Sequence, residues 1–261
     1  MQNLRLLWLF CLLAVAGCQV GTLPDPNDPA DVGSLSADNL LGQYDSVSEL
    51  LQSRVASRQV TQEQSNELLR QASDSLLTGF NPDKADVAKL WRIADVMVSA
   101  KHWTDAKPVL EAAVEYAKLK HNEDRRVNDS LSLARVFAEM GNVPEAIKIA
   151  RSVFNVGPRD GAPILFATLY RVAPAGRGKG HDPELAKLIE DAIEIALHVQ
   201  VDTTSLPGEQ FLMGRRHHIE LAWQLVEDLY TDAQKPDLAE KARVKADGML
   251  KKASVGRPVR V

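Results

Sequence analysis

Histidine has the widest chemical range of the side chains in this sequence, because imidazole can bind a metal or transfer a proton near neutral pH. The six histidines are His102, His121, His181, His198, His217 and His218. Only the last two are adjacent, and neighbouring side chains on a helix point about 100° apart, so the two cannot chelate one ion together. No His-Glu-x-x-His motif occurs. The pattern predicts scattered histidines and no metal site.

A glycine-rich stretch from Gly176 to Gly180 contains Arg177 and Lys179. A Walker-type phosphate loop needs a glycine five places before its Gly-Lys pair, and a serine or threonine directly after the lysine. This chain has Ala173 and Gly180 in those places. We therefore predict a mobile basic loop over 174–182. If it is functional, it could contact an acidic partner, an anionic glycan or lipid head groups.

Other catalytic and nucleic-acid signals are missing from the sequence. No Gly-x-Ser-x-Gly motif occurs, and the acidic residues are spread along amphipathic segments without a distinct pair. The net charge is −4, with 31 basic and 35 acidic residues, so the chain lacks the basic excess typical of nucleic-acid binders. We expect a protein that is not an enzyme, needs no cofactor and binds no nucleic acid.

Both cysteines, Cys11 and Cys18, lie at the start of the chain. Arg5 precedes an apolar run from Leu6 to Ala16, which is far shorter than the roughly twenty residues of a membrane-spanning helix. A positive start, a short apolar run and small residues are typical of a signal peptide. Cleavage before Cys18 would leave one cysteine, so we expect no internal disulfide.

The residues Val15, Ala16, Gly17 and Cys18 resemble the lipobox of bacterial lipoproteins. The resemblance implies cleavage before Cys18, a diacylglyceryl group on its sulfur and acylation of its new amino group, with chains such as palmitate. Two or three acyl chains suffice for stable anchoring. Gln19 stands where aspartate implies inner-membrane retention in the resembling enterobacterial proteins, so an outer-membrane address facing the periplasm is favoured. An ordinary secretory signal or a short anchor with an incidental cysteine is the alternative.

Residues 18–44 are rich in proline, glycine and aspartate. Pro24, Pro26 and Pro29 prevent a continuous helix, and such a segment buries little apolar surface. We expect a flexible tether, and a coil of about 25 residues spans roughly 25–30 Å. The tether would let the folded body stand off the membrane surface.

From residue 45 onward the sequence predicts helices nearly throughout, since alanine and leucine are abundant and only 5% of residues are aromatic. Capping-box patterns at Ser46–Glu49 and Thr61–Gln64 predict helices over 46–57 and 61–77. The expected apolar faces are Leu50, Leu51, Val55, Leu68, Leu69, Leu76 and Leu77. The segment from Gly79 to Asp83 predicts the end of one helix and the start of the next, and Asp182-Pro183 predicts a further helix start.

Residues 127–160 combine small and large residues at regular positions. A small–apolar pair, an aromatic residue, a turn glycine, a small residue and a closing proline occupy Leu133 and Ala134, Phe137, Gly141, Ala146 and Pro158. The unit resembles a tetratricopeptide repeat, a hairpin in which small residues let two antiparallel helices approach closely.

Three looser copies of this unit are expected. They comprise Ile93, Ala94, Met97, Ala106 and Ala113 over 87–120; Phe166, Ala167 and Tyr170 with a second helix from Pro183 to about Val199; and Trp223, Val226, Tyr230, Ala239 and Ala246 over 220–253. The first copy lies 40 residues before the best unit, against a family period of about 34. We attribute the difference to a polar insertion over 121–126. An irregular helical bundle is the alternative fold.

The predicted organisation is all-α, with antiparallel helix pairs stacked as a tetratricopeptide-like α-solenoid. The parts are a signal peptide (1–17), a lipidated cysteine and disordered tether (18–44), an N-terminal helical pair (45–80), the repeat domain (81–253) and a basic tail (254–261).

The resemblance implies a scaffold whose first helices line a groove for an extended peptide or a partner's helix. The groove candidates on the family template are Trp91, Arg92, Asp95, Arg135, Arg171, Gln224 and Asp228. Trp91 and Asp95 replace the lysine and asparagine with which chaperone-binding members hold a terminal carboxylate, so that ligand is disfavoured. We expect a membrane-anchored adaptor for an envelope protein or peptide. The alternatives are a lipoprotein that captures glycan or peptide, and a structural spacer.

Overall fold

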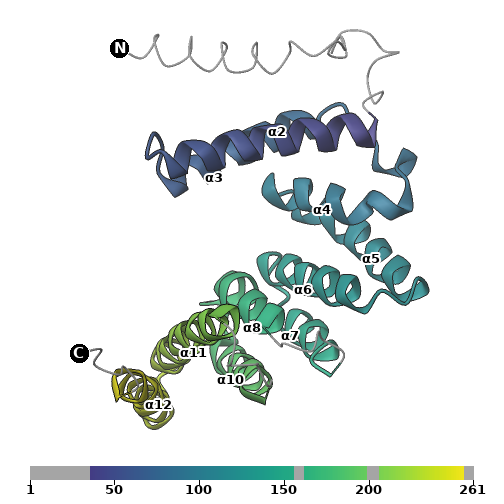
Figure 1. The fold of residues 1–261 in the computed structure, drawn as a ribbon. Coiled ribbons are helices and arrows are strands. Elements are labelled where there is room, and N and C mark those ends of the chain that lie inside the picture. The colour runs from purple at the N-terminus through teal and green to yellow at the C-terminus, as the bar shows by residue number, and fades with distance from the viewer. Residues whose placement is uncertain (1–35, 156–161, 199–205, 256–261) are drawn as a thin grey trace. The chain divides into compact units, whose positions relative to one another are not determined.

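The computed structural model describes residues 36–155, 162–198 and 206–255 (Figure 1). Within these ranges the chain is helical and contains no strand, so the all-α prediction is confirmed. None of the helices in this part of the chain combines the length and the apolarity that crossing a membrane requires. The predicted signal peptide, Cys18, the tether as far as residue 35 and the tail from residue 256 lie outside the described residues.

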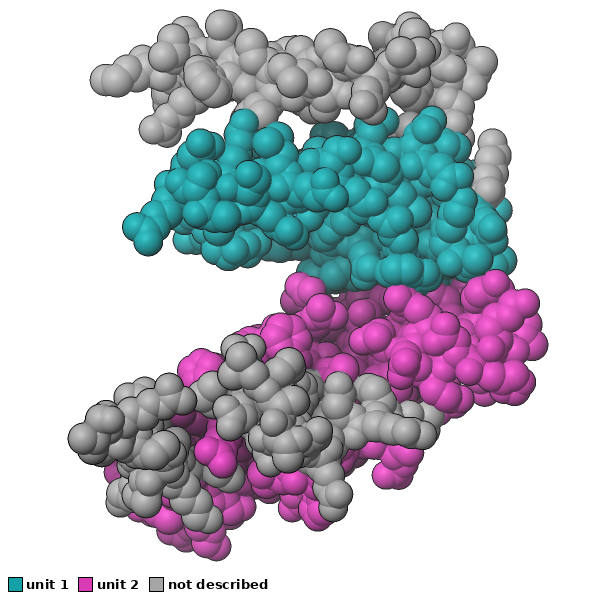
Figure 2. All heavy atoms as spheres, viewed as in Figure 1, with its two compact units in different colours: residues 1–109 teal, residues 110–261 magenta. Residues whose placement is uncertain are grey.

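The chain divides into two compact units, Met1–Val109 and Leu110–Val261 (Figure 2). Unit 1 contains α2 (Ala37–Ala56), α3 (Gln62–Leu77), the short 3₁₀ turns η1 (Pro82–Lys84) and η2 (Val87–Lys89), and α4 (Leu90–Ser99). The boundary between the units falls inside α5 (Trp103–Leu119). Unit 2 continues with α6 (Glu123–Glu139), α7 (Val143–Ser152), α8 (Ala162–Ala167), the π-helical segment η3 (Thr168–Val172), α9 (Ala173–Gly176), α10 (Asp182–His198), α11 (Leu206–Asp232) and α12 (Pro236–Val255).

The helix α2 begins nine residues before the start predicted at Ser46. Ser36 caps α2 by accepting a hydrogen bond from the Asn39 amide at 3.2 Å. Ser46, the predicted cap, lies inside the helix, where its hydroxyl donates to the Gly42 carbonyl at 2.8 Å. The prediction of tether over 37–44 is therefore wrong, because proline and glycine are sparse there and Ser36 supplies a cap.

The second predicted capping box is confirmed. Thr61 accepts from the Gln64 amide at 3.1 Å, and the Gln64 side chain accepts from the Thr61 amide at 3.0 Å. Two backbone donors at the start of α3 are thus satisfied by side chains. The predicted interruption at Gly79 to Asp83 is also present, as the turn and 3₁₀ segment that follow α3.

The apolar faces predicted for α2 and α3 are only partly buried. Leu51 is buried, whereas Leu50 remains 44% exposed and the α3 leucines are half-buried. Leu40 and Leu41, from the part of α2 that was predicted as tether, complete the buried set of this helix. Unit 1 also buries one face of α4, through Ile93, Ala94, Val96 and Met97.

One turn geometry recurs where helices end. In each case a residue with positive φ follows the helix, and the next amide donates to the carbonyl five residues earlier, as in a Schellman motif. The positive-φ residues are Arg58, Lys101, His121, Gly141 and Gln234. Lys101, His121 and Gly141 are spaced 20 residues apart, so two successive helices make a 40-residue period.

This period has a different origin from the one predicted. The polar segment 121–126 is not an insertion, since only His121 and Asn122 form the turn and α6 already begins at Glu123. Asn122 caps α6 by accepting from the Arg125 amide at 3.0 Å. The additional residues lengthen α5 and α6, each of which has 17 residues.

Neighbouring helices in unit 2 pack in pairs and also across pairs. α6 contacts α7, and it also contacts α8, η3 and α9; α11 contacts α8, α10 and α12; and α10 contacts α7. A single core of mostly alanine, valine, leucine and isoleucine side chains joins these helices. Trp223, which the sequence placed in the last copy of the repeat, is buried with 6% of its surface exposed.

The helix over 162–176 is interrupted by its π-helical segment. η3 ends directly before Ala173 and Pro174, and proline cannot donate the backbone hydrogen bond that an α-helix requires at this point. At the far end, a Cβ on Gly176 would come within 3.0 Å of the Leu185 side chain and 3.3 Å of Val143. Glycine therefore permits the close approach of this helix to α10 and α7.

Candidate functional site

The predicted groove residues fall into both units. Trp91, Arg92 and Asp95 lie on α4 in unit 1, and the other four lie in unit 2. Arg92 forms an ion pair with Asp45 of α2 and lies 5.9 Å from the centre of the Trp91 ring. Trp91 is half-buried and Asp95 is exposed. The Arg92 guanidinium thus joins two helices of its own unit.

In unit 2 the structure brings two of the predicted residues together. Arg135 of α6 and Arg171 of η3 are close enough for their charges to interact. We call them the arginine pair. Arg135 is half-buried with Glu139 4.0 Å away, whereas Arg171 is exposed and has no ion-pair partner among the described residues. The side chains of Arg135, Arg171 and Glu139 together carry a net charge of one positive unit.

Burial lowers the pKa of the Arg135 guanidinium, and the charge of Arg171 lowers it further, while Glu139 raises it. Arginine stays protonated in spite of such shifts because its ordinary pKa is above 12. Burial is the main cause of the shift, and the repulsion from Arg171 is a smaller contribution. A carboxylate beside the exposed Arg171 guanidinium would form a charge-assisted hydrogen bond with it.

The remaining predicted residues of unit 2 lie on α11. Gln224 is exposed, and Asp228 is exposed but engaged with Arg177 at 3.5 Å. Arg177 also binds Asp232 through bonds of 2.7 and 2.9 Å. Asp228 thus belongs to an ion-pair network between the end of α9 and α11.

An aromatic cluster that was not predicted as a site lies next to the arginine pair. Phe166 and Tyr170 are 44% and 42% exposed, with ring centres 4.7 Å apart. His218 of α11 packs edge-on against both rings, with centres 5.8 and 5.6 Å away. The Tyr170 hydroxyl and His218 Nδ1 share a hydrogen bond of 2.9 Å. We call Phe166, Tyr170 and His218 the aromatic surface.

The family template assigned Phe166 and Tyr170 to packing positions, and this assignment is wrong. The buried residues Leu131, Ala134 and Ala138 of α6 correspond in spacing to the buried Leu165, Thr168 and Val172. The template aligns Ala134 with Ala167, whereas the buried positions align Ala134 with Thr168, one residue further along the chain. A shift of one residue rotates a helix by about 100°, which turns both rings to the surface.

The glycine-rich loop is held in place by its side chains, so the prediction of a mobile loop is wrong. Lys179 donates to the carbonyls of Ala138 and Glu139, at 2.6 and 3.1 Å, where α6 ends. The Gly178 amide donates to the buried Asp182 carboxylate at 2.8 Å. The lysine places positive charge at the negative end of the α6 dipole. The role of this loop is to join helices.

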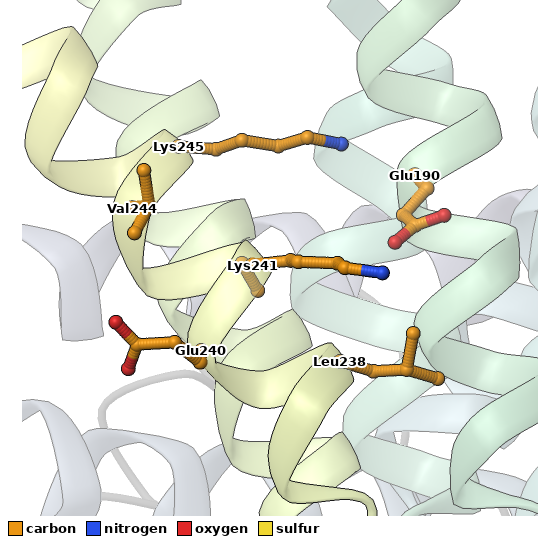
Figure 3. A pocket seen from close by; sticks show the side chains of 7 residues that line it. Glu190, Leu238, Glu240, Lys241, Val244 and Lys245 are labelled. Atoms are coloured by element: carbon orange, nitrogen blue, oxygen red, sulfur yellow. The ribbon is translucent and has the colours of Figure 1, made fainter.

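A separate depression of about 360 Å³ lies between α10 and α12 (Figure 3). Leu238, Lys241 and Lys245 extend from α12 toward Glu190 of α10, and Lys245 Nζ lies 4.1 Å from the centre of the Trp223 ring. Glu190 already binds Lys187 and the Tyr230 hydroxyl, at 3.3 and 3.4 Å. The lining also includes Glu240, Ala242 and Val244 of α12.

Within the described residues, no group of three or more histidine, cysteine or carboxylate side chains could hold a metal ion. Comparison with protein-family models and with curated proteins yields no match to this sequence. The chemistry of the site therefore rests on its own geometry. That geometry places exposed aromatic rings beside two arginines.

Proposed function

We propose that this protein is a lipid-anchored, non-catalytic adaptor of the bacterial cell envelope. In this proposal Cys18 carries the lipid and the helical body binds a protein partner. The observation that carries the proposal is the exposed face of unit 2, where the helix 162–176 contacts both α6 and α11 and the aromatic surface and the arginine pair are presented.

The proposed body is a tetratricopeptide-like solenoid. Two features support it: the 40-residue spacing of equivalent turns, and the contacts of unit 2, in which first helices contact first helices and α7 contacts α10. Stacked hairpins of this kind present their first helices as a continuous binding face. The two aromatic residues and Arg171 lie on such a first helix.

A protein partner suits this face better than a glycan. Glycan capture would use broad exposed tryptophan rings, but Trp91 and Trp103 are half-buried and Trp223 is buried. The Phe166 and Tyr170 rings are tilted by 52° to each other, so they do not form one flat platform. A net positive arginine pair beside these rings favours a polypeptide with acidic groups.

The proposal is tested by crosslinking from envelope membranes with the intact protein and three variants. Cys18→Ser should release the protein from the membrane fraction and remove the lipid mass from its N-terminal peptide. Arg135→Glu should lose one recurrent protein partner while keeping its helical content by circular dichroism. Arg243→Glu is the control, because it makes the same charge change at an exposed i, i+3 pair on α12.

A recurrent partner that Arg135→Glu loses and Arg243→Glu keeps would support the adaptor function and its face. If the anchored protein captured no partner, or if Arg135→Glu and Arg243→Glu behaved alike, the adaptor function on this face would be refuted. Retention of Cys18→Ser in the membrane fraction, with no lipid on the wild-type peptide, would refute the anchor.

A further inference from the structure

We propose that the face of unit 2 binds an acidic polypeptide segment that carries an aromatic or proline side chain close to a carboxylate. This inference rests on the proposed function and names the chemistry of the partner segment. The carboxylate would bind the exposed Arg171 of η3, which contacts α6, and the ring would pack on Phe166, Tyr170 and the exposed Pro174.

The helix 162–176 is unusually apolar for one that has an exposed side. Its fifteen residues contain a single charged side chain, Arg171, and no aspartate, glutamate or lysine. Its exposed residues among those described are Phe166, Tyr170, Arg171 and Pro174. A helix face exposed to water is normally polar, so an aromatic and proline stripe of this kind indicates a covered surface.

The two sides of this stripe have different chemistry. Toward α6, Arg171 meets Arg135; toward α11, Tyr170 and Phe166 meet His218. A segment that crosses all three helices would therefore meet cationic groups first and rings next. Helix axes about 10 Å apart give a span of about 20 Å, which about six extended residues cover.

Charge selects an acidic segment. On the α6 side of the stripe, Arg171 is exposed and has no ion-pair partner among the described residues. Asp228 and Asp232, the acids at the other end of the stripe, are bound to Arg177. A basic segment would meet repulsion at the arginine pair, and a purely apolar one would leave Arg171 without an anion.

The test is selection from a phage-displayed library of random peptides on the full chain, followed by titration of the enriched peptides. We expect enrichment of peptides with aspartate or glutamate within about three residues of phenylalanine, tyrosine, tryptophan or proline. Arg171→Glu should weaken their binding by at least about tenfold, and Phe166→Ala should weaken it by several-fold. Arg243→Glu should change it by less than about twofold.

Several outcomes would overturn the inference. They are enrichment without acidic residues, equal effects of Arg171→Glu and Arg243→Glu, or no enrichment at all. Self-association that Phe166→Ala abolishes, measured by sedimentation, would identify a second copy as the occupant and would also overturn it. A crosslinked envelope partner whose capture is insensitive to Arg171→Glu would leave the adaptor function standing while refuting the acidic segment.

Discussion

Replacing Lys179 by methionine tests whether the glycine-rich loop joins helices. The change removes the ammonium but keeps most of the apolar stem, so packing is nearly preserved. The ammonium donates to two carbonyls at the end of α6, and one of these hydrogen bonds is partly buried. A charge-assisted bond contributes about 1.5–3 kcal/mol when well shielded, and a cation at a helix end about 0.3–1 kcal/mol. Since the second hydrogen bond is exposed, we expect Lys179→Met to lower the free energy of unfolding by about 1–2 kcal/mol.

The assay is thermal and urea unfolding of the full chain, followed by circular dichroism. A loss of this size should lower the midpoint temperature of unit 2 by about 2–8 °C without changing the urea slope. Lys148→Met is the matched control, because Lys148 is 74% exposed and its one ion-pair partner among the described residues is Glu145 on its own helix. Such a pair contributes about 0.3–0.5 kcal/mol. Equal losses in the two variants would refute the capping role and favour the mobile loop predicted from sequence.

Three further predictions concern stability. The buried Thr168 hydroxyl has no hydrogen-bond partner among the described residues, so Thr168→Val should stabilise unit 2 by about 1 kcal/mol, seen as a higher midpoint temperature; a lower midpoint would contradict this. Burial and His217 lower the pKa of His218 below its ordinary 6.5. The unfolded chain therefore protonates His218 more readily than the folded chain does, and the free energy of unfolding falls as the pH drops below 6.5. His218→Gln should reduce this loss of stability by less than about 1 kcal/mol, because solvent screens the partly exposed ring. Urea titrations at several pH values measure the difference, and an unchanged pH dependence would argue against a role of His218. Thr61→Ala should cost about 1 kcal/mol at the start of α3 and speed hydrogen exchange of the Gln64 amide, whereas unchanged exchange would show that the cap contributes nothing.

The positions of helices in the chain were largely predictable, because their limits depend on local signals. Thr61 with Gln64 and Asp182 with Pro183 are short-range patterns whose physical effect is independent of the rest of the fold. The start of α2 was missed since Ser46 imitates a cap inside a helix. Only the Ser36 side chain and the burial of Leu40, both properties of the folded unit, distinguish the two positions.

The candidate site was predictable only in part. Arg135 and Arg171 were assigned to a groove from the repeat pattern, and the structure brings them together. The exposure of Phe166 and Tyr170 could not be deduced, because a one-residue change of alignment decides which side of a helix is buried. The apolar composition of the helix 162–176, with one charge in fifteen residues, was the available signal. Long-range contacts such as Lys179 with the end of α6 leave no trace in local sequence.

The π-helical segment has a consequence for the exposed surface of unit 2. A π turn holds one more residue than the α turn that it replaces. Because Gly176 fits closely against Leu185 and Val143, the end of the helix is the fixed part. Deleting one residue within Thr168–Val172 would therefore rotate the preceding turns by about 100° and carry Phe166 away from His218. The presence of one residue in this segment thus decides which side chains the preceding turns expose.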